Sequence, residues 1–377
     1  MRIEQRTWTK GNGWESAHES LGESAQLVLL FGTTSILNQG QFWPEMQEFY
    51  PNAYICGCST AGEICDTRIS DNSLVCTAIE FDHTQVHGLQ IKLVEEENSF
   101  QAGQRLAQSF PREGLAHLLV ISNGLLVNGS ELVAGLTQHL PEHVTITGGL
   151  AADGELFQET LVFLNGFATS DTIVGLGFYG DRLRVGYGSH GGWFPFGPER
   201  LITRSQANVL YEMDGKSALD LYKQYLGKHA SGLPAAAMLF PLSIRTSDGI
   251  GLVRTVLSIN EARQSMTFAG DMPEGSYVRL MSTNFERLID GAAGAAQMSK
   301  QMLGCASSEL AILISCVGRR MVLKQRTEEE LEGVRDTLGK GTFLTGFYSY
   351  GEIAPLRTGG KSKLHNQTMT ITTLAEV

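Results

Sequence analysis

The feature of this sequence that most constrains its fold is a pattern of strand, helix and strand that occurs three times. The three apolar first strands lie at residues 27–32, 115–124 and 309–318. Each is followed by a helix-like stretch and a second strand that enters a glycine turn, at residues 53–64, 144–154 and 342–355. Apolar runs that flank an amphipathic segment are typical of β-α-β units. The chain is therefore predicted to have an α/β fold.

Two of the three units end in the same motif. Residues 57–64 read GCSTAGEI and residues 346–353 read GFYSYGEI, so both contain G-x-x-[ST]-x-G-E-I at the same place in the unit. Self-similarity of this kind constrains the architecture before any local prediction does. We interpret it as a diverged internal duplication.

The length of 377 residues exceeds the size at which one core keeps growing, which predicts two portions. The expected division is an extension at 1–24, a first portion at 25–214 and a second at 215–377. The boundary lies near Gly215, where an extended region gives way to a helix. Nothing there resembles a flexible linker, so the two portions are expected to pack closely.

The charge balance argues against a nucleic-acid partner. The chain has 29 Lys and Arg against 40 Asp and Glu, and no segment gathers the basic residues into a stripe. Apolar runs stay well below the roughly 18 to 20 residues of a membrane helix. The first residues lack the apolar centre of a signal peptide. A cytoplasmic location without membrane contact is expected.

The cysteines and most histidines give no strong sign of a metal site. Six cysteines lie mostly in apolar, strand-like stretches, which favours free buried thiols. Cys56, Cys58 and Cys65 lack a second Cys/His pair at zinc-finger spacing. Seven of the nine histidines lie near turns, helix ends or termini and are expected to be solvated: His18, His83, His87, His117, His139, His143 and His229.

The glycine-ended strands are the first candidates for a ligand site, because ligands of open α/β sheets lodge beyond the carboxyl ends of strands. Glu63 and Glu352 occupy equivalent positions in the duplicated motif. They are either paired carboxylates for acid–base work or caps of backbone amides in two equivalent turns, and we favour the second reading. No nucleophile with a base and no nucleotide fingerprint is recognisable, so no catalytic residue is assigned and an enzyme is not expected.

Two further histidines have more specific surroundings. His190 stands in SHGGWFPFG, where Gly191 and Gly192 would give its ring room and Trp193 an aromatic wall, as a flat apolar cofactor requires. The alternative is a histidine packed into a rigid turn. His365 and Asn366 precede the last strand and would either hydrogen-bond a ligand or tie that strand down.

The chain resembles the FIST family, whose members have a FIST N and a FIST C portion and proposed roles in sensing small ligands. The resemblance is carried by GCSTAGEI at 57–64, TGGLAADG at 147–154, residues 191–227, SCVGRR at 315–320, GFYSYGEIAP at 346–355 and the final LHNQTMTITTL. Within the family, it is similar to NosP, the haem proteins that sense nitric oxide.

This resemblance implies haem b as cofactor, nitric oxide as signal, and a sensor histidine kinase or cyclic-di-GMP signalling enzyme as partner; a homo-oligomer is left open. We assign the iron ligand to His190. The remaining cofactor-binding candidates are Trp193, Gly191, Gly192, His365, Asn366, Glu63 and Glu352. The alternative is a haem-free sensor that holds an amino acid or similar metabolite in a cleft between the FIST portions, by Glu63, Glu352 and His365.

Overall fold

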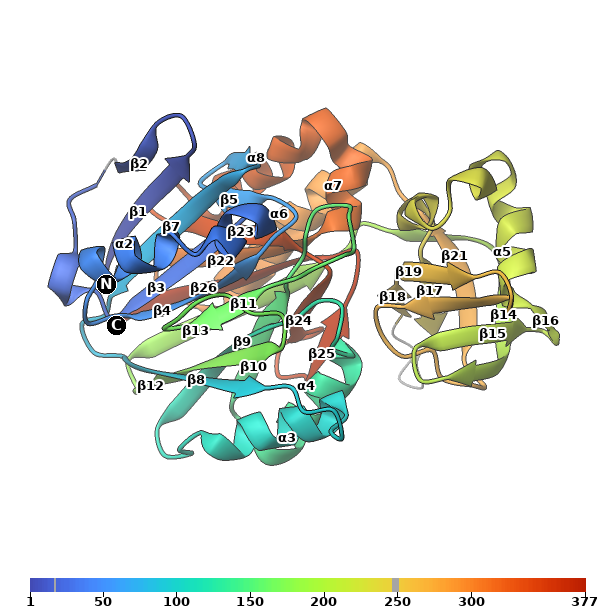
Figure 1. Ribbon diagram of the computed structural model, residues 1–377, viewed down its shortest axis with the longest axis horizontal. Coiled ribbons are helices and arrows are strands. Elements are labelled where there is room, and N and C mark those ends of the chain that lie inside the picture. Colours follow the sequence, from blue (N-terminus) through green and yellow to red (C-terminus); the bar gives the residue numbers. More distant parts are fainter. Residues whose placement is uncertain (17, 246–250) are drawn as a thin grey trace.

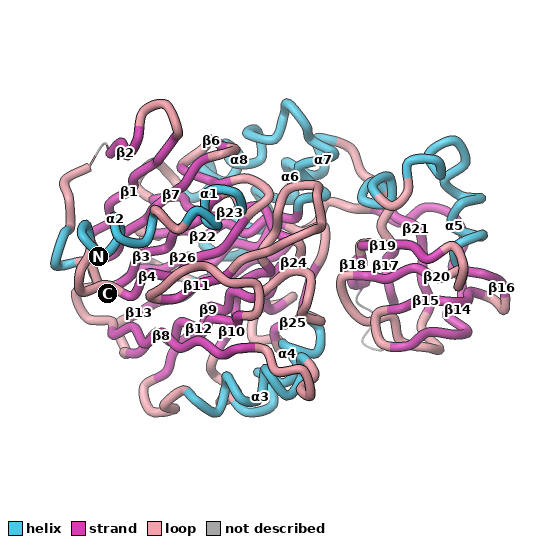
Figure 2. Tube along the Cα trace, viewed as in Figure 1, coloured by secondary structure: helices cyan, strands magenta, loops and turns pink. Residues whose placement is uncertain are grey.

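The computed structural model describes residues 1–16, 18–245 and 251–377. Three mixed sheets with helices on their outer sides form a large body, and residues 194–245 and 251–282 form a small lobe at one end of it (Figures 1 and 2). The sheets contain both parallel and antiparallel strand pairs. This arrangement confirms the predicted α/β class.

Each sheet of the body has six strands among the described residues. The first has the order β11 (Val162–Leu164), β4 (Tyr54–Ser59), β3 (Leu27–Gly32), β7 (Ser73–Glu80), β1 (Arg2–Thr9) and β2 (Gly13–Ser16). The second has the order β25 (Ser362–His365), β24 (Gly351–Pro355), β10 (Thr145–Leu150), β9 (Leu115–Ser122), β12 (Thr172–Tyr179) and β8 (Gln85–Lys92). The third has the order β13 (Leu183–His190), β26 (Met369–Glu376), β22 (Leu310–Cys316), β23 (Phe343–Ser349), β5 (Glu63–Cys65) and β6 (Arg68–Ser70).

Helices connect the strands and cover the outer faces of the sheets (Figure 1). The body contains α1 (Thr34–Gln39), α2 (Phe42–Phe49), α3 (Ser99–Ser109), α4 (Gly129–His139), α6 (Phe285–Met302), α7 (Val317–Leu323) and α8 (Thr327–Leu338), with the short 3-10 turns η1 (Gly22–Ser24) and η4 (Lys324–Arg326). The longer of these helices have one buried face, as expected for helices that cover a sheet.

The strand order reveals three tandem repeats, at residues 2–80, 85–179 and 183–376. Each repeat begins with a strand (β1, β8 or β13) that pairs with the last strand of the same repeat (β7, β12 or β26). Between them lies a parallel pair joined by helices (β3/β4, β9/β10 or β22/β23), and the last strand runs antiparallel to this pair. The small lobe is inserted between β13 and α6 of the third repeat. The three units predicted from the sequence are therefore three copies of one repeat, although only two of them end in the shared G-E-I motif.

The three repeats exchange strands in a closed ring. After its second parallel strand, each repeat crosses to another sheet: β5 pairs with β23, β24 with β10, and β11 with β4. Equivalent backbone hydrogen bonds mark the crossing points. The backbone N–H of Ala61 donates to the Tyr348 carbonyl at 2.8 Å. In the same way, the N–H of Tyr350 donates to the Leu150 carbonyl at 3.2 Å, and the N–H of Ala152 donates to the Ser59 carbonyl at 2.9 Å. Each repeat thus satisfies the backbone of a neighbour, which a single repeat could not do alone.

One glycine per repeat permits the close approach of the parallel strands. A Cβ built on Gly57 would lie 1.7 Å from the Leu30 carbonyl oxygen, and one on Gly148 or Gly346 would lie 1.8 Å from the facing carbonyl of its own repeat. Gly148 and Gly346 also have φ values of 146° and 155°, which side chains rarely adopt. The three glycines of the strand-ending motifs are therefore required by the geometry of the pairing.

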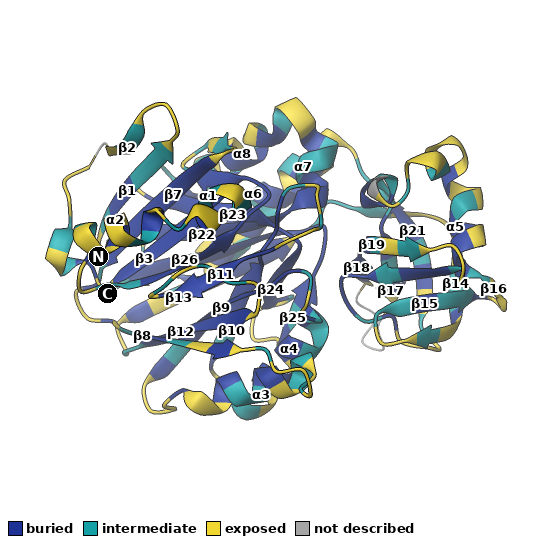
Figure 3. Ribbon diagram, in the orientation of Figure 1, coloured by how far each residue is buried: buried dark blue, intermediate teal, exposed yellow. Residues whose placement is uncertain are grey.

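The body has a central core enclosed by all three sheets. Along β9, Leu119 and Ile121 face this core with Phe31 of β3 and Ile314 of β22, whereas Leu118 and Val120 face the covering helices. The alternation follows the two-residue period of a strand. Figure 3 shows the buried strands at the centre and exposed residues on the helices. The sheets are covered on both faces, which explains why their strands are continuous apolar runs.

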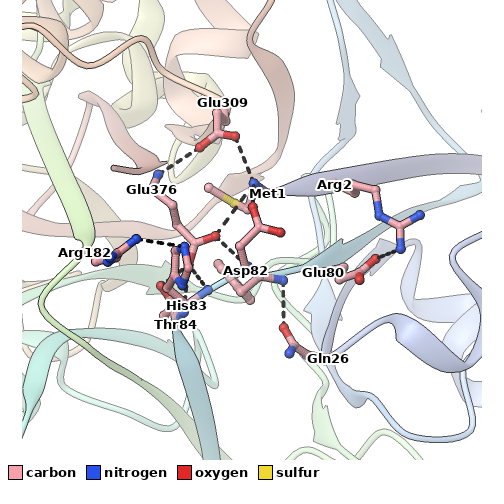
Figure 4. Close-up of polar contacts among 11 residues, drawn as sticks. Met1, Arg2, Gln26, Glu80, Asp82, His83, Thr84, Arg182, Glu309 and Glu376 are labelled. Atoms are coloured by element: carbon pink, nitrogen blue, oxygen red, sulfur yellow. Dashed lines mark hydrogen bonds and ion pairs between the residues drawn. The ribbon is translucent and has the colours of Figure 1, made fainter.

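The connections between repeats meet at one end of the body, where a polar cluster joins them (Figure 4). Glu376, near the end of the last strand, accepts hydrogen bonds from the backbone N–H groups of Asp82, His83 and Thr84, at 2.7, 3.0 and 2.7 Å. The amino group of Met1 contacts the Asp82 carboxylate at 2.7 Å. The first and last strands are thereby tied to the link between the first two repeats.

Two parts of the expected division can be placed in this architecture. Residues 1–24 contain β1, which pairs with β7 along its whole length and belongs to the first sheet. Gly215 lies in the small lobe, between β15 (Val209–Met213) and β16 (Lys216–Ser217). The third sheet combines β5 and β6 with strands from beyond residue 215.

The small lobe is an antiparallel sheet with its own core. It contains β14 (Phe194–Gln206), β15, β16, β17 (Leu242–Arg245), β18 (Gly251–Arg254), β19 (Val256–Asn260), β20 (Ser265–Phe268) and β21 (Tyr277–Ser282), with α5 (Ala218–Leu226), η2 (Gly227–Gly232) and η3 (Ala235–Leu239). Tyr222, Met266 and Phe268 are completely buried in its core. The lobe therefore packs internally and meets the body over a limited boundary (Figure 1).

The close approach at Gly346 predicts a strong effect of adding one methyl group. Gly346→Ala should lower the free energy of unfolding by about 3 kcal/mol or more, because β22 and β23 must separate and the backbone must leave its positive φ. Gly341→Ala, where a Cβ meets no atom within 4 Å, is the control and should change stability by about 0.5 kcal/mol at most. Chemical denaturation measures both; equal stability of the two variants would contradict the close-packed repeat.

Candidate ligand site between the body and the small lobe

Glu63 and Glu352 are buried at equivalent places in the first and third repeats. Glu63 accepts hydrogen bonds from the Thr60 and Ser73 hydroxyls, both at 2.7 Å. Glu352 accepts one from the Ser349 hydroxyl at 2.7 Å and another from the Thr368 hydroxyl at 2.9 Å. In both cases, one donor stands three residues earlier and the other at the start of the last strand of the repeat.

The two glutamates are not brought together as a catalytic pair. Glu63 lies on β5 in the third sheet and Glu352 lies on β24 in the second. Among the described residues, they share no hydrogen-bond partner. Burial raises the pKa of Glu63 to about 7 and that of Glu352 to about 8. The hydroxyl groups that donate to the two carboxylates lower both pKa values, but burial has the larger effect. Their shared structural role is to connect two strands of one repeat. Each glutamate lies on the strand that crosses to another sheet (β5 or β24) and accepts a hydrogen bond from a hydroxyl at the start of the last strand of the repeat (β7 or β26).

His190 ends β13, where the chain leaves the body for the small lobe. Its side chain is exposed on one side and lies over Gly291 and Gly294 of α6 on the other. Partial burial, with the positive charge of Arg319 nearby, lowers the pKa of the imidazole. His190 is therefore neutral near pH 7.

The space that Gly191 and Gly192 were expected to leave beside His190 is filled by α6. A Cβ on Gly192 would lie 2.1 Å from the Arg287 carbonyl oxygen, and the Gly192 carbonyl accepts a 2.9 Å hydrogen bond from Thr283. The two glycines allow a helix to pack on the chain, so they do not open a slot. The surroundings of His190 do not fit a haem in this conformation, and its role as an iron ligand stays a prediction.

Arg319, at the start of α7, fixes this turn from inside the body. Its buried guanidinium pairs with Glu330 at 2.6 Å and donates to the carbonyls of Gly191 at 2.6 Å and Leu288 at 2.7 Å. The Tyr348 hydroxyl also donates to Glu330, at 2.6 Å. Sequence analysis did not select Arg319, although the pair of arginines that follows an apolar strand was visible in SCVGRR. An Arg so well paired stabilises the root of the small lobe.

The stretch from His365 to Gln367 lies where the body meets the small lobe. His365 is buried, and its Nε2 lies 2.9 Å from the Ala354 carbonyl oxygen; burial lowers its pKa to about 4. Asn366 donates to the Tyr350 carbonyl at 3.3 Å. Gln367 donates to the Met238 carbonyl of the lobe at 3.0 Å. This stretch therefore ties the last strand down and also reaches across to the lobe.

Several sequence-predicted residues thus meet at this junction. Trp193 Nε1 donates to the Gln367 carbonyl at 2.9 Å, and Glu352 is the cross-strand partner of His365. Within the described parts of the chain, the side-chain oxygens of Asn366 and Gln367 are buried without a hydrogen-bond partner. A buried oxygen without a hydrogen-bond partner destabilises a protein, so these two oxygens mark the junction as a place where the protein's own groups leave hydrogen-bonding capacity unused. Glu63 lies elsewhere in the body.

Beside this junction is a cavity of about 940 Å³, which we call the interlobe cavity. It lies between α4 of the second repeat, residues 361–364 at β25, and the small lobe. Its apolar lining includes Val133, Ala134, Ile244, Leu252 and Leu364. A second cavity of about 900 Å³ adjoins it and shares Thr137, Gln138, Lys361 and Ser362. A volume of this size suits a small organic ligand.

Arg254 is the polar feature of the interlobe cavity that sequence analysis missed. It ends β18 of the small lobe and is 4% exposed. Its guanidinium donates to the Leu364 carbonyl of β25 at 3.1 Å and to the Ser130 hydroxyl of α4 at 3.4 Å. Burial lowers its pKa to about 10, so it stays charged at neutral pH. A lone Arg in VRTVLSIN carries no sequence signal, because its partners come from three distant segments.

The cysteine prediction is confirmed for four of the six thiols, which are buried: Cys56, Cys58, Cys76 and Cys316. Among the described residues, no group of three or more His, Cys, Asp or Glu is arranged to hold a metal ion. The prediction for His117 is wrong. It is completely buried, on the core face of β9 with Leu119, and its ring nitrogens lie 2.8 and 3.0 Å from the Thr145 and Thr147 hydroxyls. The hydroxyls on the neighbouring strand make a buried imidazole possible.

Three βαβ repeats, with a small lobe inserted in the third and a cavity between the lobe and the body, define an α/β protein of two parts. The comparison with known families is more specific. The chain belongs to the FIST family: the FIST N domain matches residues 26–216 and the FIST C domain matches residues 218–355. FIST domains are small-ligand sensing domains of signalling proteins, sensory rather than catalytic. In the part of the chain that the structure describes, no helix has the length and apolar character needed to span a membrane.

Individual relatives add little about function. The chain is 23% identical over 369 residues to an uncharacterized protein of Methanocaldococcus jannaschii, across 90% of this chain and 68% of the relative. Among solved structures, it is similar to a chorismatase at 12% identity and a TM-score of 0.35, over 99% and 98% of the two chains. A likeness this distant carries no conclusion about activity.

The raised pKa of Glu352 predicts how stability depends on pH. The folded state binds the proton more tightly than the unfolded state, whose Glu pKa is near 4.5, so stability should fall as pH rises from about 4.5 to 8. Glu352→Gln mimics the protonated form. The wild-type free energy of unfolding should fall by a few kcal/mol over this pH range, on the order set by the raised pKa of Glu352, and this fall should be absent in Glu352→Gln. Urea denaturation between pH 5 and 8.5 measures it.

The control is Glu332→Gln on the exposed side of α8, which removes the same charge at the surface. If the stability of Glu352→Gln and of Glu332→Gln varies with pH in the same way, Glu352 is not a protonated buried carboxyl.

Proposed function

We propose that this chain is a small-ligand sensor whose ligand is a metabolite, an amino acid or a similar small molecule, bound in the interlobe cavity without haem. The observation that carries the proposal is the position of that cavity between two parts of the fold. Its walls come from α4 and β25 on the body and from β17 and β18 on the small lobe. A ligand held by both walls favours the arrangement of the lobe that brings them together.

The boundary between lobe and body has the contacts that a sensor needs. Polar groups bridge it on both sides of the cavity: Gln367 reaches Met238, Arg254 reaches Leu364, and Asn128 donates to the Asp271 carboxylate at 2.7 Å. A ligand in the interlobe cavity contacts both parts, so its binding free energy depends on the position of the lobe, and binding favours one position over others.

A sensor of this kind transmits its state to another protein. The sequence resemblance suggests a histidine kinase or a cyclic-di-GMP signalling enzyme. The lobe is joined to the body at His190–Trp193 and near Thr283, and Arg319 holds the first of these connections through the Gly191 carbonyl. We infer that a change in lobe position reaches α6 through this turn, because α6 packs directly on Gly192. The face of α6 and α8 is the surface we expect the partner to read.

Haem-based sensing of nitric oxide remains the finer prediction from the resemblance. One observation favours His190 as a ligand, since iron binds the neutral imidazole and the lowered pKa keeps His190 in that form. The packing of α6 on the neighbouring glycines argues against a preformed haem slot. The metabolite proposal therefore fits the described geometry better.

The metabolite proposal predicts that filling the interlobe cavity abolishes binding. A thermal-shift screen with amino acids and organic acids should give ligands that raise the melting temperature of the wild-type chain. Ala134→Trp places an indole in the cavity and should remove these shifts. Ala262→Trp, in the exposed turn between β19 and β20, is the control and should keep them. Shifts that persist in Ala134→Trp would place the site elsewhere.

The haem prediction is tested by the absorption spectrum of protein reconstituted with haem. If His190 is the iron ligand, His190→Ala should lose a stoichiometric Soret band that shifts when nitric oxide binds the ferrous form. His229→Ala, at an exposed histidine of the small lobe, is the matched control. The metabolite proposal predicts no stoichiometric band in the wild-type protein, and a specific band would favour the haem sensor instead.

A further inference from the structure

We propose that the ligand of the interlobe cavity is an organic carboxylate with an apolar body, and that Arg254 is the residue that binds its carboxylate group. This inference rests on the proposed function and adds the chemical class of the ligand. Four features carry it: the hydrogen bonds of Arg254, the charge of the lining, its apolar walls and the limited number of donors.

Among the described residues, the hydrogen bonds of Arg254 include none to a carboxylate, and the Asp271 carboxylate raises the pKa of Arg254 only by its charge, without a direct ion pair. Within residues 1–16, 18–245 and 251–377, the oxygens that accept hydrogen bonds from its guanidinium are neutral: the carbonyls of Val253, Leu364 and Asp271, and the Ser130 hydroxyl. All four contacts are long, between 3.1 and 3.4 Å. Arg319 differs in this respect, because its guanidinium forms an ion pair with the Glu330 carboxylate at 2.6 Å. A buried charge of this kind is costly unless an anion pairs with it.

The charge of the lining is opposite to that of the chain. Three cationic side chains, Arg254, Lys361 and Lys363, line the interlobe cavity with one carboxylate, Asp271. The Asp271 carboxylate already accepts a hydrogen bond from Asn128 at 2.7 Å. The chain as a whole has a net charge of −11. A positive cavity in an acidic protein attracts a small anion while the rest of the surface repels it.

The apolar walls of the cavity favour a ligand that also has an apolar part. Val133 and Ala134 of α4, Ile244 and Leu252 of the small lobe, and Leu364 of β25 are among the residues that line the cavity. Apolar groups on both walls stabilise an apolar ligand body by roughly 25 cal/mol for each Å² that leaves water. The ligand that matches both features has a carboxylate at one end and a hydrocarbon or aromatic body at the other.

The donor set favours a carboxylate over a phosphate. Among the described lining residues, one guanidinium is buried, and its planar fork matches the two oxygens of a carboxylate. Phosphate sites of α/β proteins use several backbone N–H groups of a glycine-rich loop, and glycine is not among the lining residues of this cavity. Preferential binding of a phosphorylated compound would therefore overturn the assignment of the ligand as a carboxylate.

The experiment compares carboxylic acids with their primary amides. Each acid of a library, such as 3-phenylpropionate, is titrated beside its amide by calorimetry, with the wild-type chain. At least one acid should bind ten-fold or more tightly than its amide. Arg254→Gln should weaken that acid ten-fold or more and leave its amide unchanged. Arg254→Lys keeps the charge but not the fork and should weaken the acid less than Arg254→Gln.

The control is Arg263→Gln, which removes an exposed arginine from the same lobe and should not change binding. If Arg254→Gln fails to fold, the wild-type comparison of each acid with its amide still decides. A compound binds in the cavity if Ala134→Trp abolishes its binding. If such compounds bind equally as acid and amide, or more tightly as phosphates, the carboxylate assignment is overturned but the proposed function is not. If Ala134→Trp blocks no compound, the proposed function itself fails.

Discussion

The structure depends on a ring of three backbone hydrogen bonds, through which each repeat satisfies the next. Ala61, Ala152 and Tyr350 occupy equivalent positions, and each donates to the carbonyl of an equivalent residue in a different repeat. Around these bonds, each repeat places one or two strands at the edge of a neighbouring sheet. An isolated repeat would leave those edges unpaired and its core face exposed, so the three repeats are stable only together.

The same ring determines where the interlobe cavity lies. The second and third repeats meet where β24 and β25 join the sheet of β10, and the small lobe inserted in the third repeat faces α4 of the second. An insertion with its own core does not disturb the ring, because both of its connections to the body lie in one interval of the third repeat, between β13 and α6. The interlobe cavity is thus formed by the ring of repeats on one side and the inserted lobe on the other, which is the arrangement that the proposed sensor requires.

Much of this fold could be predicted from the sequence. The three β-α-β units, the buried strands and the equivalence of Glu63 and Glu352 follow from local patterns, since apolar runs and glycine positions reflect pairing within a repeat. The ring did not follow, because the second repeat ends in AADG without the G-E-I motif and its exchanged strand begins only at Val162. Local patterns also gave the wrong environment for His117, whose buried hydroxyl partners lie on another strand.

The candidate site was predicted only in part. His365, Asn366 and Trp193 do lie at the junction, since an unusual polar stretch before a strand indicates specific contacts. Arg254 and the cavity were missed, because three distant segments must fold together before that arginine has partners. At His190, the glycines were read as space for a ligand, whereas they make space for α6. A glycine pair indicates a close approach but does not say what approaches.

The most direct test of the account is amide hydrogen exchange of the full chain, followed by mass spectrometry, with and without the carboxylate that binds most tightly. The account predicts slower exchange at both walls of the interlobe cavity, in residues 128–138 and 361–366 of the body and 251–256 of the lobe. Protection confined to residues 188–193 around His190, with exchange at both walls unchanged, would contradict it.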